Sequence, residues 1–589
     1  MNILLGITDF KDILFAQAVL LLENKGIDIS QIHYICTKKY DKIDSTIAGF
    51  YKNKNIDVFI SSSSSSGKIK NERDYEALEE EVFKWYLKII SGKDNNIYAF
   101  IGGGHKYHSL ALQRAAFLFG ARDIFHMFYD GERGQEPKDI NEVLEAIKNK
   151  KLLYASFGEE TGWPALKYLN SNSDNIRKDI LSITGAIASR SIKHVNEYPF
   201  ECINLLPAKA IEWLEAPLTK KDKEWILNLP KTELHCHLGG FATHGEGLDS
   251  VRKAASGKIP DKKSIPYPDN WPLPDKTIDL KNYMNLGDNN GSYILKDEGC
   301  LVRQCELLYD HFTDQNIRYA EVRCSPFNYA SDDMTGIEVL NVIRDTFNNK
   351  MSEAKQSNIR WCHVNLIIIA TRKPNEDKIS IIKHIGLATA AAEQSKTRGR
   401  CKVVGVDLAG YEHKETRASY FEQDFEPIHR AGVAITIHAG ENDEAEGIWQ
   451  AVFKLNTRRI GHGLRLYQSK ELQRSVVDRK IGVEMCPYAN YQIVGFSPMK
   501  NHETEYPLLK YLNAGVQACI NTDNIGISKA SLTDNFMLLP KLLPDITRMQ
   551  VLRLIRNGLE QSFIDNSFRN ALIRIFNEDI FKLIFYHKQ

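Results

Sequence analysis

The first 150 residues alternate short apolar runs with stretches in which apolar positions recur at helical spacing. The apolar runs predict strands at residues 2–8, 32–37, 57–62, 96–103 and 123–129. Strands that alternate with helices in this way are typical of a parallel sheet with helices on both faces. Ligands bind such sheets at the carboxyl ends of the strands, so we expect the loops at 8–11, 61–68 and 102–109 to share one edge.

From residue 231 onward the strand candidates are separated by longer segments. Eight apolar runs predict strands at 232–238, 319–325, 363–370, 402–409, 434–440, 459–465, 482–488 and 517–523. Most of the gaps hold amphipathic helical patterns, and eight strands with intervening helices predict a (β/α)₈ barrel of the TIM type. The stretch between the two patterns is less regular, with a possible strand at 152–157, and is interpreted as a connector. We therefore expect an α/β protein with domains at 1–150 and 226–589, joined by 151–225.

Composition and charge restrict the function classes. The 589 residues carry 76 basic and 75 acidic side chains, which excludes a polycationic nucleic-acid coat, and no direct DNA binding is expected. No apolar run approaches the roughly 18–20 residues that span a bilayer, so we expect no membrane integration. The ten cysteines form no CxxC pair, and the amino terminus has no basic, cleavable leader pattern. These features indicate a cytoplasmic protein.

Residues that bind metals collect at the predicted ends of the barrel strands. His235 and His237 are two apart on the first strand, so their side chains point to one face. His438 lies at the end of the fifth strand and Asp523 at the end of the eighth. Three imidazoles and one carboxylate suit Zn²⁺ with a position left for water, whose pKa the ion lowers to about 7. The alternative, four buried side chains satisfied by hydrogen bonds, is disfavoured because the same residue types recur at separate strand ends.

Two further residues suit proton transfer beside such a metal. Glu441 lies three residues after His438, close enough to act as a proton shuttle, and His462 lies at the end of the sixth strand. Hydroxide attack at C6 of an adenine ring needs an activated water, a proton donor for the ring nitrogen and a group that manages the proton of the water. The sequence offers a residue for each of these tasks.

Five motifs resemble, in order, the motif series of the adenosine deaminase family of metal-dependent hydrolases. They are KTELHCHLGG (231–240), GVDLAG (405–410), TIHAGE (436–441), RIGHG (459–463) and NTDN (521–524). The resemblance implies a zinc site made by His235, His237, His438 and Asp523, the last of which also belongs to the catalytic set. It further implies that Glu441 protonates N1 of the purine, that His462 orients or deprotonates the attacking water, and that a backbone amide at Gly410 contacts the purine. The implied reaction is hydrolytic deamination to the inosine form with release of ammonia.

Two positions depart from the family pattern and bear on the substrate. Gly239 replaces an Asp that follows the HxHL motif, and Asn524 replaces a second Asp after the metal ligand. Loss of the first carboxylate removes a charge that would repel a 5′-phosphate, whereas Asn524 can still donate a hydrogen bond to a purine N7. The segment that follows is basic, with Arg252, Lys253, Lys258, Lys262 and Lys263. We therefore expect ATP, deaminated to ITP, to be preferred over adenosine.

The segment 101–121 combines a strand, a glycine-rich turn and a helix, an arrangement that suits phosphate binding. It lacks the GxGxxG and GK[ST] patterns, so ATP hydrolysis by this domain is disfavoured. Together with the opening NILLGIT and the Asp9 that follows, it resembles the CARF domains, the Rossmann-like sensors of CRISPR defence systems. The resemblance implies an activator site for cyclic oligoadenylate made by Thr8, Asp9, Gly103, Gly104, His105, Lys106, His108 and Ser109. An ordinary solvated helix terminus is the alternative.

The two resemblances together imply a CARF–adenosine deaminase effector of type III CRISPR antiviral defence. Such an effector would be activated allosterically by cyclic oligoadenylate and would form a homo-oligomer built from CARF dimers, because a two-fold ligand site requires two copies. Two alternatives remain at this point: a constitutive adenosine deaminase of purine salvage, and a non-catalytic regulatory protein that binds nucleotides. The presence of every expected metal ligand and of Glu441 argues against the non-catalytic alternative.

Overall fold

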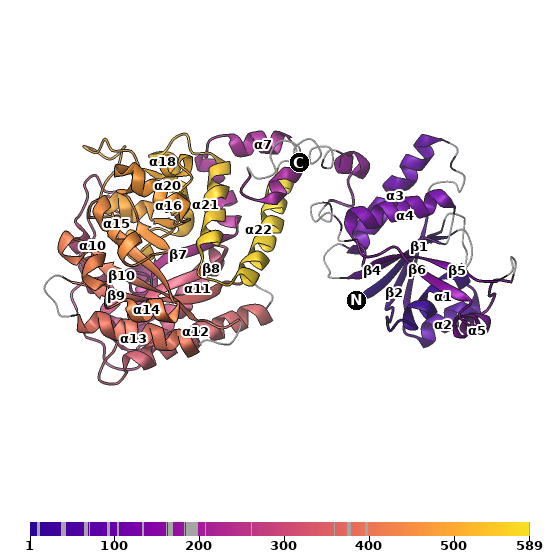
Figure 1. Ribbon diagram of the computed structural model, residues 1–589, viewed down its shortest axis with the longest axis horizontal. Helices are drawn as coiled ribbons and strands as arrows, with labels where there is room; N and C mark the ends of the chain where they lie inside the picture. Colours follow the sequence, from indigo (N-terminus) through magenta and orange to yellow (C-terminus); the bar gives the residue numbers. More distant parts are fainter. Residues whose placement is uncertain are drawn as a thin grey trace. The chain divides into compact units, whose positions relative to one another are not determined.

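A computed structural model of the chain divides into two compact units (Figure 1). One unit is Met1–Val195 with Asn204–Pro207, and the other is Asn196–Ile203 with Ala208–Gln589. The structure describes all residues except 9–11, 37–42, 64–68, 70, 91–94, 103–104, 132–134, 161, 163–165, 167–168, 182, 184–197, 207, 261, 358–359, 374–377, 395–398 and 588–589.

The amino-terminal unit is built on one sheet with the strand order β3-β2-β1-β4-β5-β6. Its strands are β1 (Asn2–Thr8), β2 (Gln31–Cys36), β3 (Asp57–Ser62), β4 (Asn96–Phe100), β5 (Asp123–Tyr129) and β6 (Leu152–Ser156). The first five are parallel, as the sequence predicted, and their carboxyl ends lie at one edge. Strand β6 is antiparallel to β5 and lies inside the stretch that was interpreted as a connector. The order of the strands reverses between β1 and β4, which is where sheets of this Rossmann-like type leave a crevice for ligands.

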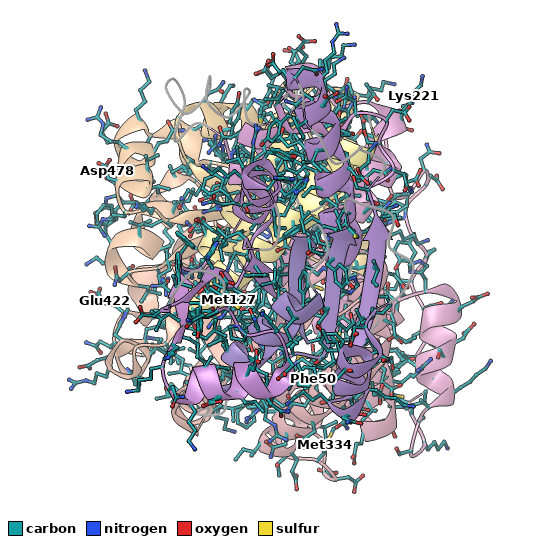
Figure 2. The ribbon with its side chains drawn as sticks, turned by 90° about the vertical axis from the view of Figure 1, so that its right-hand side faces the viewer. Phe50, Met127, Lys221, Met334, Glu422 and Asp478 are labelled. Atoms are coloured by element: carbon teal, nitrogen blue, oxygen red, sulfur yellow. The ribbon has the colours of Figure 1, made fainter. Side chains whose placement is uncertain are left out.

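Helices cover both faces of this sheet. They are α1 (Asp12–Glu23), α2 (Ser45–Asn53), α3 (Glu72–Ile90), α4 (Lys106–Phe119) and α5 (Ile140–Lys148). Helices α1, α2 and α5 lie on one face, and α3 and α4 pack together on the other (Figure 1). On the first face the ring of Phe15 stacks on Tyr34, with centroids 4.6 Å apart. Met127 belongs to the same buried cluster and Phe50 packs against it (Figure 2).

The second unit is an eight-stranded parallel barrel. Its strands follow one another in sequence order: β7 (Lys231–His237), β8 (Ile317–Cys324), β9 (His363–Arg372), β10 (Val403–Gly410), β11 (Ala434–Ala439), β12 (Arg459–His462), β13 (Gly482–Met485) and β14 (Gln517–Ile520). A parallel bridge between Cys236 and Asp523 joins the last strand segment to the first. There the Asp523 N–H donates to the His235 carbonyl, and the His237 N–H donates to the Asp523 carbonyl, each at 2.8 Å. The predicted barrel is confirmed.

The last three strands end earlier than the sequence predicted. Strand β12 ends at His462 and β14 at Ile520, so Asp523 lies three residues beyond its strand and not at its end. His462 and Asp523 both have positive φ angles, 63° and 60°, so extended backbone cannot continue through them to the predicted ends at 465 and 523. Strand β13 stops because Pro487 begins a helix and carries no N–H for the ladder.

Helices form a layer around the barrel, seen for α10 to α14 in Figure 1. They are α7 (Ala208–Glu215), α8 (Lys223–Asn228), α9 (Gly245–Lys253), α10 (Leu280–Asn290), α11 (Glu298–Asp314), α12 (Gly336–Gln356), α13 (Ile379–Gln394), α14 (Glu426–Ala431), α15 (Ala445–Lys454), α16 (Lys470–Asp478), α17 (Pro487–Ile493), α18 (Leu508–Asn513), α19 (Ile525–Ser528), α20 (Leu532–Leu542), α21 (Arg548–Gln561) and α22 (Asn566–His587). Among the described residues, no helix combines the length and apolar character needed to cross a membrane.

The interior of the barrel carries charge where most barrels carry aliphatic side chains. Arg323 and Arg459 are the largest fully buried side chains of the described residues. Arg323 bonds Asp407 at 2.7 Å and also bonds Glu484, while Arg459 bonds Glu484 and Glu321, each at 2.5 Å. Ions without water are tolerated only when they are paired in this way. A layer of ion pairs therefore underlies the carboxyl ends of the strands.

Candidate active site

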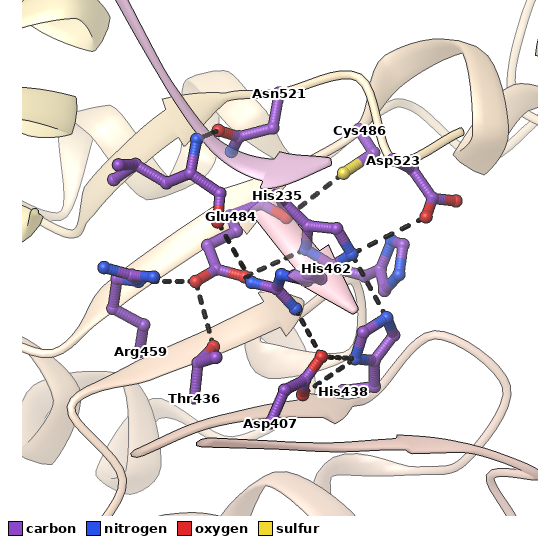
Figure 3. Close-up of polar contacts among 12 residues, drawn as sticks. His235, Asp407, Thr436, His438, Arg459, His462, Glu484, Cys486, Asn521 and Asp523 are labelled. Atoms are coloured by element: carbon purple, nitrogen blue, oxygen red, sulfur yellow. Dashed lines mark hydrogen bonds and ion pairs between the residues drawn. The ribbon is translucent and has the colours of Figure 1, made fainter. Parts of the chain in front are cut away.

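Four predicted metal ligands converge at the carboxyl end of the barrel. Figure 3 shows three of them, His235, His438 and Asp523. Nε2 of His235 lies 3.1 Å from Nε2 of His438 and 3.3 Å from Nε2 of His237. Oδ1 of Asp523 lies 3.3 Å from Nε2 of His237 and 3.6 Å from Nε2 of His235. All four ligand atoms lie within 4.8 Å of one another. The structure thus brings together the four residues that the sequence singled out from three strands and a loop.

Carboxylates lie behind two of these histidines, and they decide the tautomer of His235. Nδ1 of His235 lies 2.9 Å from Oε2 of Glu484, and Nδ1 of His438 lies 3.1 Å from Oδ1 of Asp407. Burial is the main cause that lowers the pKa of His235 well below its usual range, so the ring is neutral. A carboxylate accepts only, so the single ring proton lies on Nδ1 and the Nε2 lone pair faces the cluster.

This arrangement fits a cation at the centre of the cluster. Nε2 of His235 directs a lone pair into the cluster, where Nε2 of His438 and Nε2 of His237 lie 3.1 and 3.3 Å away, so a positive ion here would lie among imidazole nitrogens. Burial also raises the pKa of Asp523 to about 6, and a cation would favour its charged form. Three nitrogens and one oxygen are the donor set of catalytic zinc sites. The residues present therefore fit Zn²⁺.

Asp407 and Glu484 are the residues that the sequence reasoning missed. Asp407 lies inside a motif that was quoted without giving it a role, and Glu484 lies in a predicted strand. Both are fully buried, and Glu484 is held further by the Thr436 hydroxyl at 2.9 Å. A carboxylate in the middle of an otherwise apolar barrel strand was the available signal, since acidic side chains are almost never buried unless paired.

Glu441 lies beside the metal cluster on the loop after β11. The backbone N–H groups of Glu441 and Asn442 donate to the carboxylate of Glu412 at 3.0 and 2.7 Å, which fixes this loop. Among the described residues Oε1 of Glu441 has no hydrogen-bond partner, although Nδ1 of His462 lies 3.4 Å away. Burial, with the nearby charges of Asp523 and Glu412, raises the pKa of Glu441 well above its usual range. The side chain is therefore held as a neutral acid that can donate a proton.

His462 is oriented by an amide whose direction is fixed. Oδ1 of Asn490 accepts from the Cys486 N–H at 3.1 Å and from the Tyr506 hydroxyl at 2.9 Å. The amide nitrogen of Asn490 must then face Nδ1 of His462, 2.9 Å away, and donate to it. Nδ1 of His462 is an acceptor, so its neutral ring carries the proton on Nε2. The left-handed backbone of His462 is the kind of strain that collects at functional sites.

The space beside Gly239 is occupied by other side chains. A Cβ at this position would lie 2.8 Å from the Tyr329 hydroxyl and 3.1 Å from Oγ of Ser292. The Ser292 hydroxyl also donates to the Gly239 carbonyl at 2.6 Å. Gly239 lacks the negative charge of the Asp in the family pattern. The space beside it is filled by the hydroxyl groups of Ser292 and Tyr329, which come from later segments of the chain. Loss of the carboxylate therefore does not leave an open space at this position.

Asn524 and Gly410 have positions consistent with substrate contact. Nδ2 of Asn524 donates to Oδ1 of Asp523 at 2.8 Å, which leaves the second N–H of the amide. A Cβ at Gly240 would lie only 1.9 Å from Oδ1 of Asn524, so this glycine makes room for the amide. Gly410 ends β10 with φ at 98°, and a Cβ there would lie 2.6 Å from the Arg372 carbonyl. Only glycine is compatible with that backbone and that contact.

The predicted activator residues lie partly outside the described residues. Asp9, Gly103 and Gly104 are not among the described residues. The others flank the point where the strand order reverses, with Thr8 buried at the end of β1 and Lys106 exposed at the start of α4. His105 is exposed as well, whereas two of the predicted side chains are engaged with the turn itself. Nδ1 of His108 accepts from the His105 N–H at 3.2 Å, and the Ser109 hydroxyl donates to the Ile101 carbonyl at 2.5 Å.

Comparison with known proteins places residues 230–578 in one family. They match the model of the family described as adenosine deaminase. The chain is 31% identical to an adenosine deaminase of Clostridium acetobutylicum over 353 residues, covering 60% of this chain and 98% of that protein. It is 30% identical to an adenosine deaminase of Clostridium kluyveri over 345 residues, covering 58% of this chain and 92% of that protein.

Solved structures with lower identity are also similar. An adenine deaminase from Arthrobacter aurescens has 20% identity and a TM-score of 0.48, covering 60% of this chain and 99% of that one. The N6-methyl-AMP deaminase of Arabidopsis thaliana has 22% identity and a TM-score of 0.47, covering 60% of this chain and 98% of that one. The family model spans more than half of the chain, and its residues include all four ligands of the metal cluster. The chain is therefore a hydrolase of the adenosine deaminase family.

Proposed function

We propose that the barrel is a zinc-dependent deaminase that hydrolyses the amidine C–N bond of an adenine nucleotide, releasing ammonia and the inosine form. The observation that carries this proposal is the convergence of three Nε2 atoms and Asp523 beside the unbonded carboxyl of Glu441. Zinc in such a site supplies a hydroxide nucleophile at neutral pH, because it lowers the pKa of water to about 7. The family membership of residues 230–578 supports the same reaction.

The side chains of the site would divide the remaining work. Glu441 holds a proton in a buried carboxyl and would deliver it to N1 of the purine as electron density builds there. His462 presents an Nε2–H group and would hold the attacking oxygen through that hydrogen bond. Of the two roles that the family resemblance implied, this tautomer supports orientation of the water over its deprotonation. Asn524 offers its second N–H to N7, and Gly410 allows close approach of the backbone.

We further propose that ATP is preferred over adenosine at this site. The position of Gly239 presents the hydroxyls of Ser292 and Tyr329 and no carboxylate, so a 5′-phosphate meets no opposing charge there. Residues that follow Asn524 in the sequence, among them Lys529, line a cavity of about 270 Å³ together with His244. Exposed lysines of the predicted basic segment, at 253, 258, 262 and 263, lie on or after helix α9 of the same unit. These cations would attract a polyphosphate.

Comparison of kcat/KM for adenosine, AMP and ATP tests the substrate. The value for ATP is expected to be the highest, and a higher value for adenosine would refute the nucleotide preference. Gly239→Asp is a poor test, because its side chain would have to displace Tyr329. Lys529→Met, in which a side chain of similar length loses its charge, should lower kcat/KM for ATP about tenfold and leave adenosine unchanged. Lys470→Met, an exposed lysine at the start of α16, is the matched control.

The amino-terminal unit is proposed to be a CARF-like sensor that binds cyclic oligoadenylate and raises turnover in the barrel, within type III CRISPR antiviral defence. Support comes from the reversal of strand order between β1 and β4, next to Thr8 and the exposed His105 and Lys106. Activation requires that the ligand binds one state of the assembly better than the other, and a CARF dimer would give the two-fold site. Saturating cyclic oligoadenylate should raise kcat or lower KM. If it changes neither, the constitutive salvage deaminase is the correct alternative.

A further inference from the structure

A cavity of about 560 Å³ opens at the end of the barrel opposite to the metal cluster. It is lined by the first residues of β9, by residues that begin β10, by the last turns of α12 and by the segment between α21 and α22. Its volume lies within the range of small-molecule sites. The side chains that give it its chemical character are Lys355, Trp361, His363, Lys402, Phe563 and Phe568.

Aromatic rings form the apolar part of this cavity. The ring of His363 meets Phe568 edge-on, with centroids 4.9 Å apart, and Trp361 is half-buried beside them. Phe563 lies between the cavity and the barrel interior, where its ring packs under the guanidinium of Arg459 at 3.5 Å from carbon to centroid. Flat rings of this kind pack well against a planar ligand.

Two lysines give the cavity a positive side. Among the described residues neither Lys355 nor Lys402 makes an ion pair, and the cavity has one acidic lining residue, Asp565. Oδ1 of Asp565 is engaged at the start of α22, where it accepts from the Phe568 N–H at 2.8 Å. Burial and then the charge of Lys355 lower the pKa of His363 to about 4, as a positive field would.

We propose that this cavity is a second ligand site, which binds a small planar aromatic anion between its rings and its two lysines. The rings account for the flat part of the ligand and the lysines for its negative group. The site is separate from the metal cluster, because it lies at the start of β9 and β10 and the metal ligands lie at or beyond the ends of β7, β11 and β14. The proposal does not depend on the reaction proposed for the barrel.

A continuous series of buried hydrogen bonds links the cavity to the metal cluster. The Phe563 N–H donates to Oε1 of Glu321 at 2.6 Å, and Oε2 of Glu321 accepts from Arg459 at 2.5 Å. Arg459 bonds Glu484 at 2.5 Å, and Glu484 holds Nδ1 of His235 at 2.9 Å. The side chains of Glu321, Arg459 and Glu484 connect the two ends. All three are fully buried, so none can move out into solvent when a neighbour shifts. A ligand that shifts Phe563 would therefore change the metal affinity at His235, and zinc would change ligand affinity by the same factor.

Binding of 1-naphthyl phosphate to the full chain, measured by titration calorimetry, tests the site. It should bind at least about tenfold more tightly than either 1-naphthol or inorganic phosphate, because only it has both the ring and the charge. A saturating concentration of inosine keeps the probe out of the deaminase site. The probe should quench tryptophan fluorescence in the parent chain. Loss of this quenching in Trp361→Phe would place the probe in this cavity. No binding, or binding no tighter than phosphate alone, overturns the proposal.

Variants that remove the charge of the two lysines test whether these lysines bind the probe. Lys355→Met with Lys402→Met should weaken binding of 1-naphthyl phosphate at least about tenfold. The control Lys350→Met lies on the same helix α12 but pairs with Asp310, and it should bind the probe like the parent chain. Unchanged binding by the double variant overturns the assignment of the lysines. Zinc affinity is measured by chelator competition with and without 1-naphthyl phosphate. The two values should differ at least threefold in the parent chain and should not differ in the double variant. Equal values in the parent chain overturn the link to His235.

Discussion

Nδ1 of His235 and Oε2 of Glu484 lie 2.9 Å apart inside the barrel, and both side chains are inaccessible to water. Glu484 belongs to β13, which is separated from the β7 strand of His235 by β14. The pair fixes the tautomer of His235 and so decides which nitrogen faces the metal. Asp407 lies against Nδ1 of His438 in the same way. Two carboxylates outside the cluster therefore orient two of its histidines.

Asp407→Asn should weaken zinc binding about 10- to 100-fold, as removal of the partner of a metal-binding histidine does. The amide can no longer hold His438 through a charged acceptor, although its shape is retained. Competition with a chelator of known affinity measures the effect. Asp424→Asn, which disturbs an ion pair with Lys378 just before helices α13 and α14, is the control. Equal zinc affinity in Asp407→Asn and the parent would show that the carboxylate has no part in the metal site.

The purified protein should contain about one zinc ion per chain, because the four ligands form one site with a position left for water. His235→Ala should lose zinc and deaminase activity together, since it removes the ligand at the centre of the cluster. Metal analysis and an ammonia-release assay on the same samples measure both. His429→Ala, on the exposed side of α14, should retain both. Activity that persists after zinc has been lost would contradict a metal-dependent reaction.

Glu441→Gln should keep the zinc and lose at least ~10²-fold in turnover, because the amide cannot deliver a proton to the ring nitrogen. The substitution preserves the shape of a buried side chain whose Oε1 has no hydrogen-bond partner among the described residues, so the fold should be unaffected. Steady-state kinetics together with metal content separate the two effects. Turnover close to that of the parent would remove Glu441 from the role of proton donor.

Asn490→Leu should lower kcat about tenfold without loss of zinc. The substitution removes the N–H that holds Nδ1 of His462 and thereby frees the ring to change tautomer and orientation. Because Asn490 acts through His462, KM should change less than kcat. Asn490→Asp tests the opposite tautomer of His462, because a carboxylate accepts hydrogen bonds and would force the ring proton onto Nδ1. A kcat for Asn490→Leu equal to that of the parent would show that the amide is structural only.

Lys106→Ala should weaken binding of cyclic oligoadenylate by about tenfold or more, because an exposed cation next to the β1–β4 reversal is removed. Zinc content and the basal rate of the barrel should stay the same. Equilibrium binding of labelled cyclic oligoadenylate measures the first and activity without activator the second. Lys148→Ala, an exposed lysine in the last turn of α5, is the control. Equal affinity in the two variants would argue against a contact between Lys106 and the activator.

The sequence predicted most of the fold because its strands are continuous apolar runs bounded by polar residues. All eight barrel strands and all six strands of the first sheet lie where those runs occur, whereas the antiparallel direction of β6 depends on its pairing with β5. The metal ligands were visible because each lies in a short local motif. The roles of Glu484 and Asn490 were not visible, because they depend on which strand ends face each other across the barrel.

The filled space at Gly239 illustrates the same limit. Nothing next to this residue in the sequence indicates that Ser292 and Tyr329 lie against it, since both come from later segments of the chain. A missing side chain in a motif therefore does not by itself predict a hole in the folded site. The interior packs closely, and another segment takes the vacant volume.

The bridge between Cys236 and Asp523 also joins two segments that lie far apart along the chain. A ribosome makes the strand of His235 and His237 first, and these two histidines leave the exit tunnel long before Asp523 has been translated. Until then the sheet has two open edges and the metal cluster lacks its oxygen ligand. A metal site that includes Asp523 can therefore be complete only once the barrel seam has closed.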